Sequence, residues 1–283
     1  MRSASALLAM GLAMILFAAS SSISGVIAGE KGKDAKAVRL AVVITPYESG
    51  LLDYLLSDFT NATGIDVEVY SGHDVYERAR AGKADLVISH YGRPELESFV
   101  LDGRGHWPRA VFSNQSVIIG PSSDPASVRD SSNALEAFER IAASKSPFIP
   151  NLTPKVAYLS QILQEQASWP VEPSWVVKTP VAQSHAAKLA DDHNGYFIWG
   201  ARPFLKYKAK HQSDLEILHT DDPILQRVMV STVVAASNSS IINLEGAQAL
   251  QDYLLSPEVQ SKIASFRSPD SNIQLWWPAG RNN

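Results

Sequence analysis

The sequence predicts an α/β protein whose sheet is largely parallel, and two observations in the first third of the chain lead to that prediction. Short apolar runs rich in β-branched residues indicate three strands, at 38–44, 65–69 and 84–89. Each run is followed by apolar positions at helical spacing, over 51–59, 74–81 and 94–101. Strands that alternate with helices at these spacings are typical of βαβ units, in which the strands run parallel.

The segment at 45–50, between the first strand and the first helix, is a candidate anion site. We expect Ser49 to cap the helix, because its hydroxyl can accept a hydrogen bond from an amide of the first turn. Free amides and the positive end of the helix dipole both face such a loop. An ordinary turn without a ligand is the alternative. Since the carboxyl ends of parallel strands meet at one edge, 90–93 should lie on the same rim.

The strand predicted over 110–121 has a polar centre. Apolar residues flank Asn114, Gln115 and Ser116 on both sides, and Gly120-Pro121 ends the run. A strand that connects two lobes carries polar groups into the cleft in this way, and a strand with one exposed face gives the same pattern. Both interpretations stay open on the pattern alone.

The rest of the chain continues the alternation of strands and helices. We expect helices at 134–143, 156–167, 181–191, 244–255 and 257–266, and strands at 195–199, 215–218, 228–230 and 232–236. Asn243 is the expected cap of the helix at 244–255. The tail at 273–278 should be extended and packed, because its two adjacent Trp bury a large area.

The N-terminus predicts export. A positive charge at Arg2 precedes an apolar run, and small residues follow it, so 1–28 is predicted to be a signal peptide and 29–37 a charged tether. An uncleaved anchor is the alternative. The chain has no Cys, so it has neither disulfides nor thiolate metal ligands, and its net charge of -4 shows no pattern that suggests a nucleic-acid partner.

Four stretches in order carry a resemblance to a known family. They are VRLAVVITPYESGLLDYLLSDFTNATGIDVEV, GKADLVISHYGRPELESFVLDGRG, VFSNQSVIIGPSSDPASV and IINLEGAQALQDYLLSPEVQSKIASF. The chain resembles the extracellular solute-binding proteins of ABC importers, in the branch of tungstate-binding and related molybdate- and phosphate-binding proteins. The resemblance covers nearly all of the chain from Val38 onward.

The resemblance implies a two-lobed, periplasmic-binding-protein-like fold, with two crossover strands and a ligand cleft between the lobes. Lobe I is expected at 38–113 plus 231–283, and lobe II at 114–230. It also implies a periplasmic or secreted monomer that carries a small solute, in particular an oxyanion, to an ABC permease in the inner membrane. No cofactor, metal or catalytic residue is implied.

The chain departs from the family pattern in both of its anion loops. In the first loop only the hydroxyls of Thr45 and Ser49 remain. The second loop, after Pro147-Phe148, lacks the family's Arg and Ser-Gly-Thr, and Pro150 and Pro154 each remove a backbone donor. We therefore expect a site in which other residues replace part of the family's donors: Thr45, Tyr47, Ser49, His90, Asn114, Gln115, Asn151, Thr153 and Lys155.

Three classes of function stay open. The first is a binding protein for a small anion or another small polar solute. The second is a ligand-sensing or scaffold protein on the same fold that has lost oxyanion binding, which the altered second loop permits. The third is an enzyme, for which the sequence shows no catalytic pairing. His185 with Asp191–His193 could form a metal cluster, but the run is typical of a solvated helix end.

Overall fold

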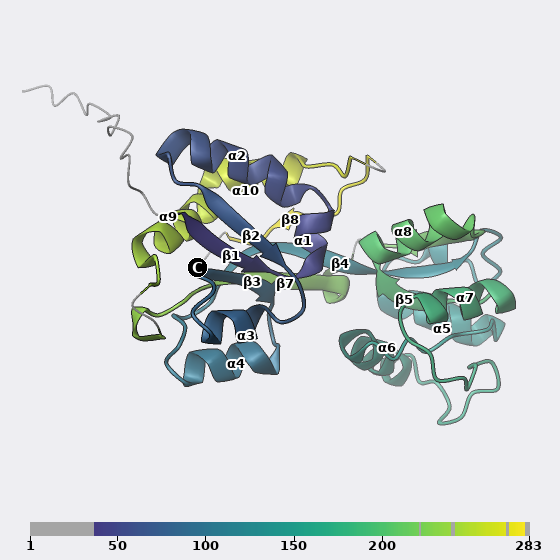
Figure 1. Ribbon diagram of the computed structural model, residues 1–283. Helices are drawn as coiled ribbons and strands as arrows, with labels where there is room; N and C mark the ends of the chain where they lie inside the picture. The colour runs from purple at the N-terminus through teal and green to yellow at the C-terminus, as the bar shows by residue number, and fades with distance from the viewer. Residues whose placement is uncertain (1–36, 221, 239–240, 270–271, 281–283) are drawn as a thin grey trace, which may run out of the picture. The chain divides into compact units, whose positions relative to one another are not determined.

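The computed structural model describes residues 37–220, 222–238, 241–269 and 272–280 (Figure 1). The predicted signal peptide at 1–28, and the predicted tether except for its last residue, lie outside these residues. Within the described ranges, no helix has the length and apolar character that crossing a membrane requires.

The first sheet is built on three parallel strands, as the alternation of strands and helices predicts. β1 (Val38–Val42) lies between β2 (Val67–Ser71) and β3 (Leu86–His90), and β7 (Gln226–Val233) pairs with β3 in antiparallel orientation. Figure 1 shows helices on both sides of this sheet. They are α2 (Leu51–Thr63), α9 (Leu244–Leu255) and α10 (Pro257–Ser265) on one side, and α3 (Val75–Arg80) and α4 (Pro94–Leu101) on the other.

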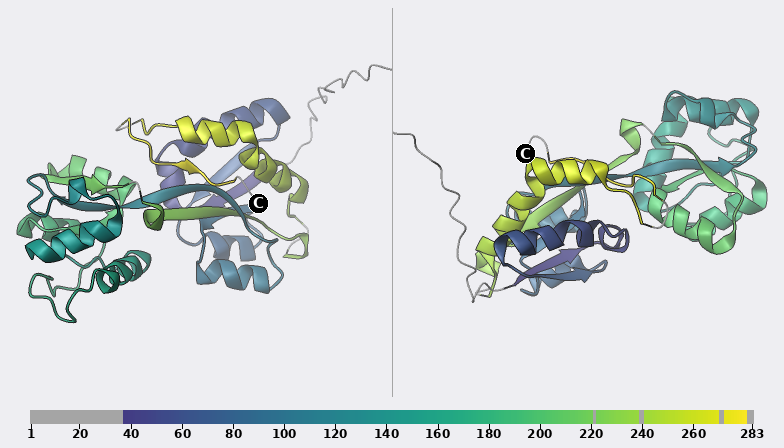
Figure 2. Two further views of the ribbon diagram at one scale, coloured as in Figure 1. Left: turned by 180° about the vertical axis from the view of Figure 1, so that it is seen from behind. Right: turned by 90° about the horizontal axis from the view of Figure 1, so that it is seen from above.

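One long strand, β4 (Arg109–Pro121), belongs to two sheets. From Arg109 to Gln115 it pairs with β7, and from Ser116 to Pro121 it pairs with β5 (Phe197–Gly200) and β6 (Leu215–His219). Figures 1 and 2 show β4 passing from the elements around β1 to those around β5. The polar centre of this strand therefore lies where it passes from the first sheet to the second.

Helices cover the second sheet on both faces. They are α5 (Ala134–Ser144), α6 (Pro154–Gln166), α7 (Ser184–His193) and α8 (Ala201–His211). Side chains of β5 alternate between two apolar clusters: Phe197 and Trp199 belong to the larger one with α7 and α8, and Ile198 belongs to the smaller one with α5 and α6. This alternation is expected of a strand buried on both faces.

The aromatic tail packs as the sequence predicts. Trp276 is fully buried, and its ring meets that of Phe112 in an edge-to-face arrangement with the centroids 5.1 Å apart. The indole Nε1 donates a hydrogen bond to Ser49 Oγ at 2.9 Å. The next two residues form β8 (Trp277–Pro278), which pairs with β4.

Three local predictions were wrong, and one helix was missed. The predicted loop after the first strand contains a short helix, α1 (Ile44–Glu48), and α2 is capped by Gly50 rather than by Ser49. The Ser49 hydroxyl does accept from the first-turn amide of Leu51, at 3.4 Å, and it also donates to Pro46 O and accepts from Trp276 Nε1. The two extended segments predicted at 228–230 and 232–236 form one strand, β7, and α8 was not predicted at all.

Candidate functional site

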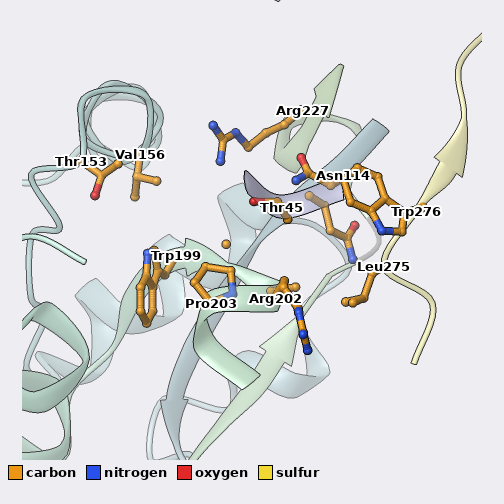
Figure 3. Close-up of a pocket in the computed structure, with 13 residues that line it drawn as sticks. Thr45, Asn114, Thr153, Val156, Trp199, Arg202, Pro203, Arg227, Leu275 and Trp276 are labelled. Carbon is orange, nitrogen blue, oxygen red and sulfur yellow. The ribbon is translucent and has the colours of Figure 1, made fainter. Parts of the chain in front are cut away.

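A small cavity lies where β4 passes from the first sheet to the second, beside the start of β7 (Figure 3). Its volume is about 70 Å³, far below the roughly 300–1,000 Å³ of pockets that hold drug-sized molecules. Residues from both parts of the fold line it. They are Thr45 of α1, Asn114 and Gln115 of β4, Thr153 beside α6, Val156 of α6, Trp199 to Pro203 at the β5–α8 junction, Arg227 of β7, and Leu275 and Trp276 of the tail.

Arg227 is the residue of this cavity with the most unusual environment. Its side chain is partly buried, its Nε is shielded from solvent, and the guanidinium has no hydrogen-bond or ion-pair partner among the described residues. In Figure 3 the guanidinium extends toward the side of the cavity formed by Thr153 and Val156. Burial lowers the pKa of Arg227, but an Arg side chain stays charged in a protein. A buried cation without a counter-charge is costly, and a bound anion relieves that cost.

Uncharged polar groups surround this cation. Gln226 Nε2 donates to Gln115 Oε1 at 3.4 Å, and Gln226 Oε1 accepts from Ser113 Oγ at 2.8 Å. The Asn114 side chain lies 3.4 Å from His90 Nε2. These contacts orient the two amides of β4 beside the cavity. The strand that crosses between the sheets therefore supplies fixed dipoles and no negative charge.

A second cavity of about 360 Å³ shares Arg227 with the first. His90, at the end of β3, and Lys155, in the first turn of α6, both line it. Desolvation, followed by the nearby charges of Arg227 and Lys155, lowers the pKa of His90 to about 3, so its imidazole is neutral at pH 7. Lys155 Nζ donates a hydrogen bond to Tyr91 O, and desolvation followed by repulsion from Arg227 lowers the pKa of Lys155. Positive charges thus gather around this cavity.

The structure brings six of the nine predicted site residues to these two cavities. Thr45, Asn114, Gln115 and Thr153 line the first one, and His90 and Lys155 line the second.

Tyr47, Ser49 and Asn151 are not among the residues that line the two cavities. The Tyr47 side chain is 46% exposed, and Ser49 is buried against the tail. Asn151 is fully engaged in holding its own loop. Its amide donates to Ile198 O at 3.1 Å, and its carbonyl accepts from the Thr153 backbone and hydroxyl and from Gln183 N.

Sequence reasoning missed the two Arg residues of the first cavity. Arg227 is the second residue of β7 and lies just before the strand predicted at 228–230, so the local sequence pattern did not mark it as a site residue. Arg202 follows β5; it donates to Glu48 O at 2.9 Å, and Figure 3 shows its guanidinium directed away from that of Arg227. The family pattern places an Arg only in the loop after Phe148, where this chain has none.

The sequence of the chain matches a known family over most of its length. The model of the family described as bacterial extracellular solute-binding protein matches residues 40–266. The chain belongs to this family. The predicted resemblance to extracellular solute-binding proteins is therefore confirmed.

Two relatives align with most of this chain. The chain is 27% identical over 278 residues to the tungstate-binding protein TupA of Peptoclostridium acidaminophilum, with 96% of each chain covered. It is 28% identical over 248 residues to a Haloferax volcanii protein named as an ABC transporter anion-binding protein, which covers 84% of this chain and 71% of that protein.

Solved structures show the same fold. The tungstate-binding protein TupA from Desulfovibrio alaskensis G20 superposes with a TM-score of 0.73 at 24% identity, covering 87% of this chain and 99% of that one. The tungstate ABC transporter protein from Geobacter sulfurreducens gives a TM-score of 0.64 at 24% identity, covering 81% and 98%. The predicted two-lobed α/β fold class is thereby confirmed, and the lobe boundaries stay a prediction.

Proposed function

We propose that this chain is an exported solute-binding protein that holds a small anion at Arg227 and delivers it to an ABC importer. One observation carries the proposal: a partly buried guanidinium without a partner among the described residues faces a cavity between the two parts of the fold. An anion bound there gains charge-assisted hydrogen bonds, and the guanidinium fork can make two of them in parallel.

The composition of the cavity walls supports an anion over a cation. None of the residues found lining either cavity is acidic, whereas hard metal ions prefer carboxylate ligands. The Thr45 hydroxyl and the amides of Asn114 and Gln115 are uncharged groups that can donate to an anion. With Arg227 they form a set of donors that converge from α1, β4 and β7.

The size of the first cavity favours a compact anion. A volume of about 70 Å³ is several times what one water molecule requires, which fits a tetrahedral oxyanion and excludes a peptide or a disaccharide. Relatives named as tungstate-binding and anion-binding proteins support the same class of solute. Tungstate and molybdate are therefore the first oxyanions to test.

Calorimetry of the purified mature chain with tungstate, molybdate, sulfate and phosphate tests this proposal. We expect at least one of these anions to bind, and Arg227→Gln to weaken its binding by about 10- to 100-fold, since each charge-assisted hydrogen bond contributes about 1.5–3 kcal/mol. Arg129→Gln is the matched control. It removes the same charge from an exposed ion pair with Glu216 outside both cavities, and should leave the affinity unchanged.

The alternative is a ligand-sensing or scaffold protein that has lost oxyanion binding. It is favoured by the second loop, where the Thr153 hydroxyl donates to Asn151 at 2.9 Å and the two Pro residues have no N–H to offer. If none of the four anions binds to folded protein that has been stripped of ligand, the alternative is supported.

The proposed role also includes export and the division into lobes. We propose cleavage near residue 28, a monomer in the periplasm or outside the cell, and lobes at 38–113 plus 231–283 and at 114–230. The family description supports the compartment. N-terminal sequencing of the exported protein should begin near Gly29, and an intact Met1 in the membrane fraction would contradict export as a soluble protein.

A further inference from the structure

The second cavity has an apolar wall that a simple oxyanion leaves unused. Its apolar lining includes Tyr158, Leu159 and Ile162 of α6, Ile224 of the short 3-10 turn Pro223–Leu225, and Val228 of β7. Tyr158 is 68%, Ile224 44% and Val228 39% exposed. Apolar side chains left exposed together beside a ligand cavity indicate a surface that a ligand or partner covers.

The volume and position of this cavity favour a small molecule as the occupant. About 360 Å³ lies within the roughly 300–1,000 Å³ of small-molecule pockets, and the cavity is walled by helix α6, by β7 and by the end of β3. A protein partner would need a much broader contact area than such a cavity provides.

The charges define the other end of that molecule. Arg227 lines both cavities, so a group bound to its guanidinium lies at the junction of the two. Lys155 adds a second cation at the same wall, and none of the residues found lining the second cavity is acidic. The cavity therefore presents a cationic end and an apolar end, which is complementary to an amphipathic anion.

We infer that the natural solute is an organic anion, with its acidic head group at Arg227 and a compact apolar or aromatic group between α6 and β7. This inference rests on the proposed function and specifies its solute class. It requires that, for one and the same head group, an added apolar substituent increases affinity.

Benzenesulfonate and methanesulfonate test this requirement directly, because they carry the same charged head and differ in the apolar group. Calorimetry of the mature chain should give at least about tenfold tighter binding for benzenesulfonate, from the apolar area that its ring buries. Arg227→Gln should weaken the binding of both compounds. The inorganic oxyanions are measured in parallel on the same preparation.

Ile224→Ser separates the apolar wall from the cationic site. Since Ile224 is 44% exposed, the substitution leaves the core intact, and it should remove most of the advantage of benzenesulfonate while leaving methanesulfonate unchanged. Ile241→Ser is the matched control, because Ile241 is 50% exposed and is not among the residues lining either cavity. It should change neither affinity.

The possible results distinguish this inference from the proposed function. If inorganic oxyanions bind through Arg227 but the ring gives no advantage, or if Ile224→Ser leaves the advantage intact, the inference is overturned and the proposed function stands. If neither the sulfonates nor the oxyanions bind, both are overturned. A dimer at micromolar concentration that Ile224→Ser dissociates would also overturn the inference, since a second copy would then cover the apolar wall.

Discussion

Replacing Asp85 by Asn should destabilise the first sheet far more than the loss of one charge suggests. Asp85 is fully buried between β1 and the start of β3. One carboxylate oxygen accepts from the backbone N and the Nε of Arg39, at 2.8 and 3.0 Å. The other accepts from Arg39 Nη2 at 2.5 Å and from the backbone N of Asn243, the cap of α9, at 2.9 Å. Desolvation raises the pKa of Asp85, but these hydrogen bonds outweigh it and lower that pKa overall.

The arrangement sets the size of the effect. Whichever oxygen becomes the amide NH₂ in Asp85→Asn, two donors face a donor and lose their acceptor. Two lost hydrogen bonds to a charged group correspond to about 3–6 kcal/mol, which agrees with the roughly 3–5 kcal/mol typical of a broken buried ion pair. Urea unfolding followed by tryptophan fluorescence should therefore show the free energy of unfolding falling by about 3–5 kcal/mol.

The matched control is Asp102→Asn, which removes an Arg80 partner at the surface. Its side chain is 50% exposed, so the loss should be at most about 1 kcal/mol. Equal losses in the two variants, with unchanged denaturant dependence, would refute the reasoning that burial and the four converging donors decide the cost.

Three further predictions concern pH, packing and capping. The folded-state pKa of His90 is about 3 and its ordinary value is 6.5, so the unfolded chain takes up a proton below pH 6.5 that the folded chain does not. Stability should therefore fall as pH falls from 6.5 toward 3, and urea titrations should show a smaller fall in His90→Gln; an equal fall would contradict this. In Gly195→Ala the new Cβ would lie 2.3 Å from Ile149 Cδ1 and 3.0 Å from the Pro147 carbonyl oxygen. This overpacking should lower the free energy of unfolding by about 1–3 kcal/mol, and the melting temperature should fall with it. An unchanged melting temperature would show that the buried Ile149 can move. Asn133→Ala removes the acceptor of Glu136 N at 2.8 Å and should cost about 0.5–2 kcal/mol in urea unfolding; a neutral result would mean that solvent caps α5 equally well.

Local sequence patterns were sufficient to predict most of the fold. The spacing of apolar residues and the cap at Asn243 correctly predicted α9. The polar centre of β4 lies where that strand passes between two sheets, which is one of the two interpretations that the pattern left open. These features depend on periodicity and on hydrogen bonds within a few residues, so one sequence contains them.

The composition of the site depends on contacts between distant residues. Ser49 was expected to face a ligand, but its hydroxyl is taken by Trp276, which lies 227 positions away. Asn151 was expected to bind a ligand, but it bonds to Ile198 and Gln183. Arg227 reaches the cavity only because β7 pairs with β4 there, and no local pattern around Arg227 reports that pairing. The helix α8 was missed for a different, local reason: only Ala201, Phe204 and Tyr207 of its residues are buried, so its apolar pattern is weak.

The location of a bound anion tests the central claim most directly. Crystals of the mature chain soaked with tungstate can be measured at an X-ray energy where tungsten scatters anomalously, which locates the metal atom independently of any assumed site. We predict a peak in the cavity lined by Thr45, Asn114 and Arg227, with anion oxygens within about 3 Å of the guanidinium nitrogens. A peak elsewhere on the molecule, or none at a concentration that saturates binding in solution, would contradict an anion site at Arg227.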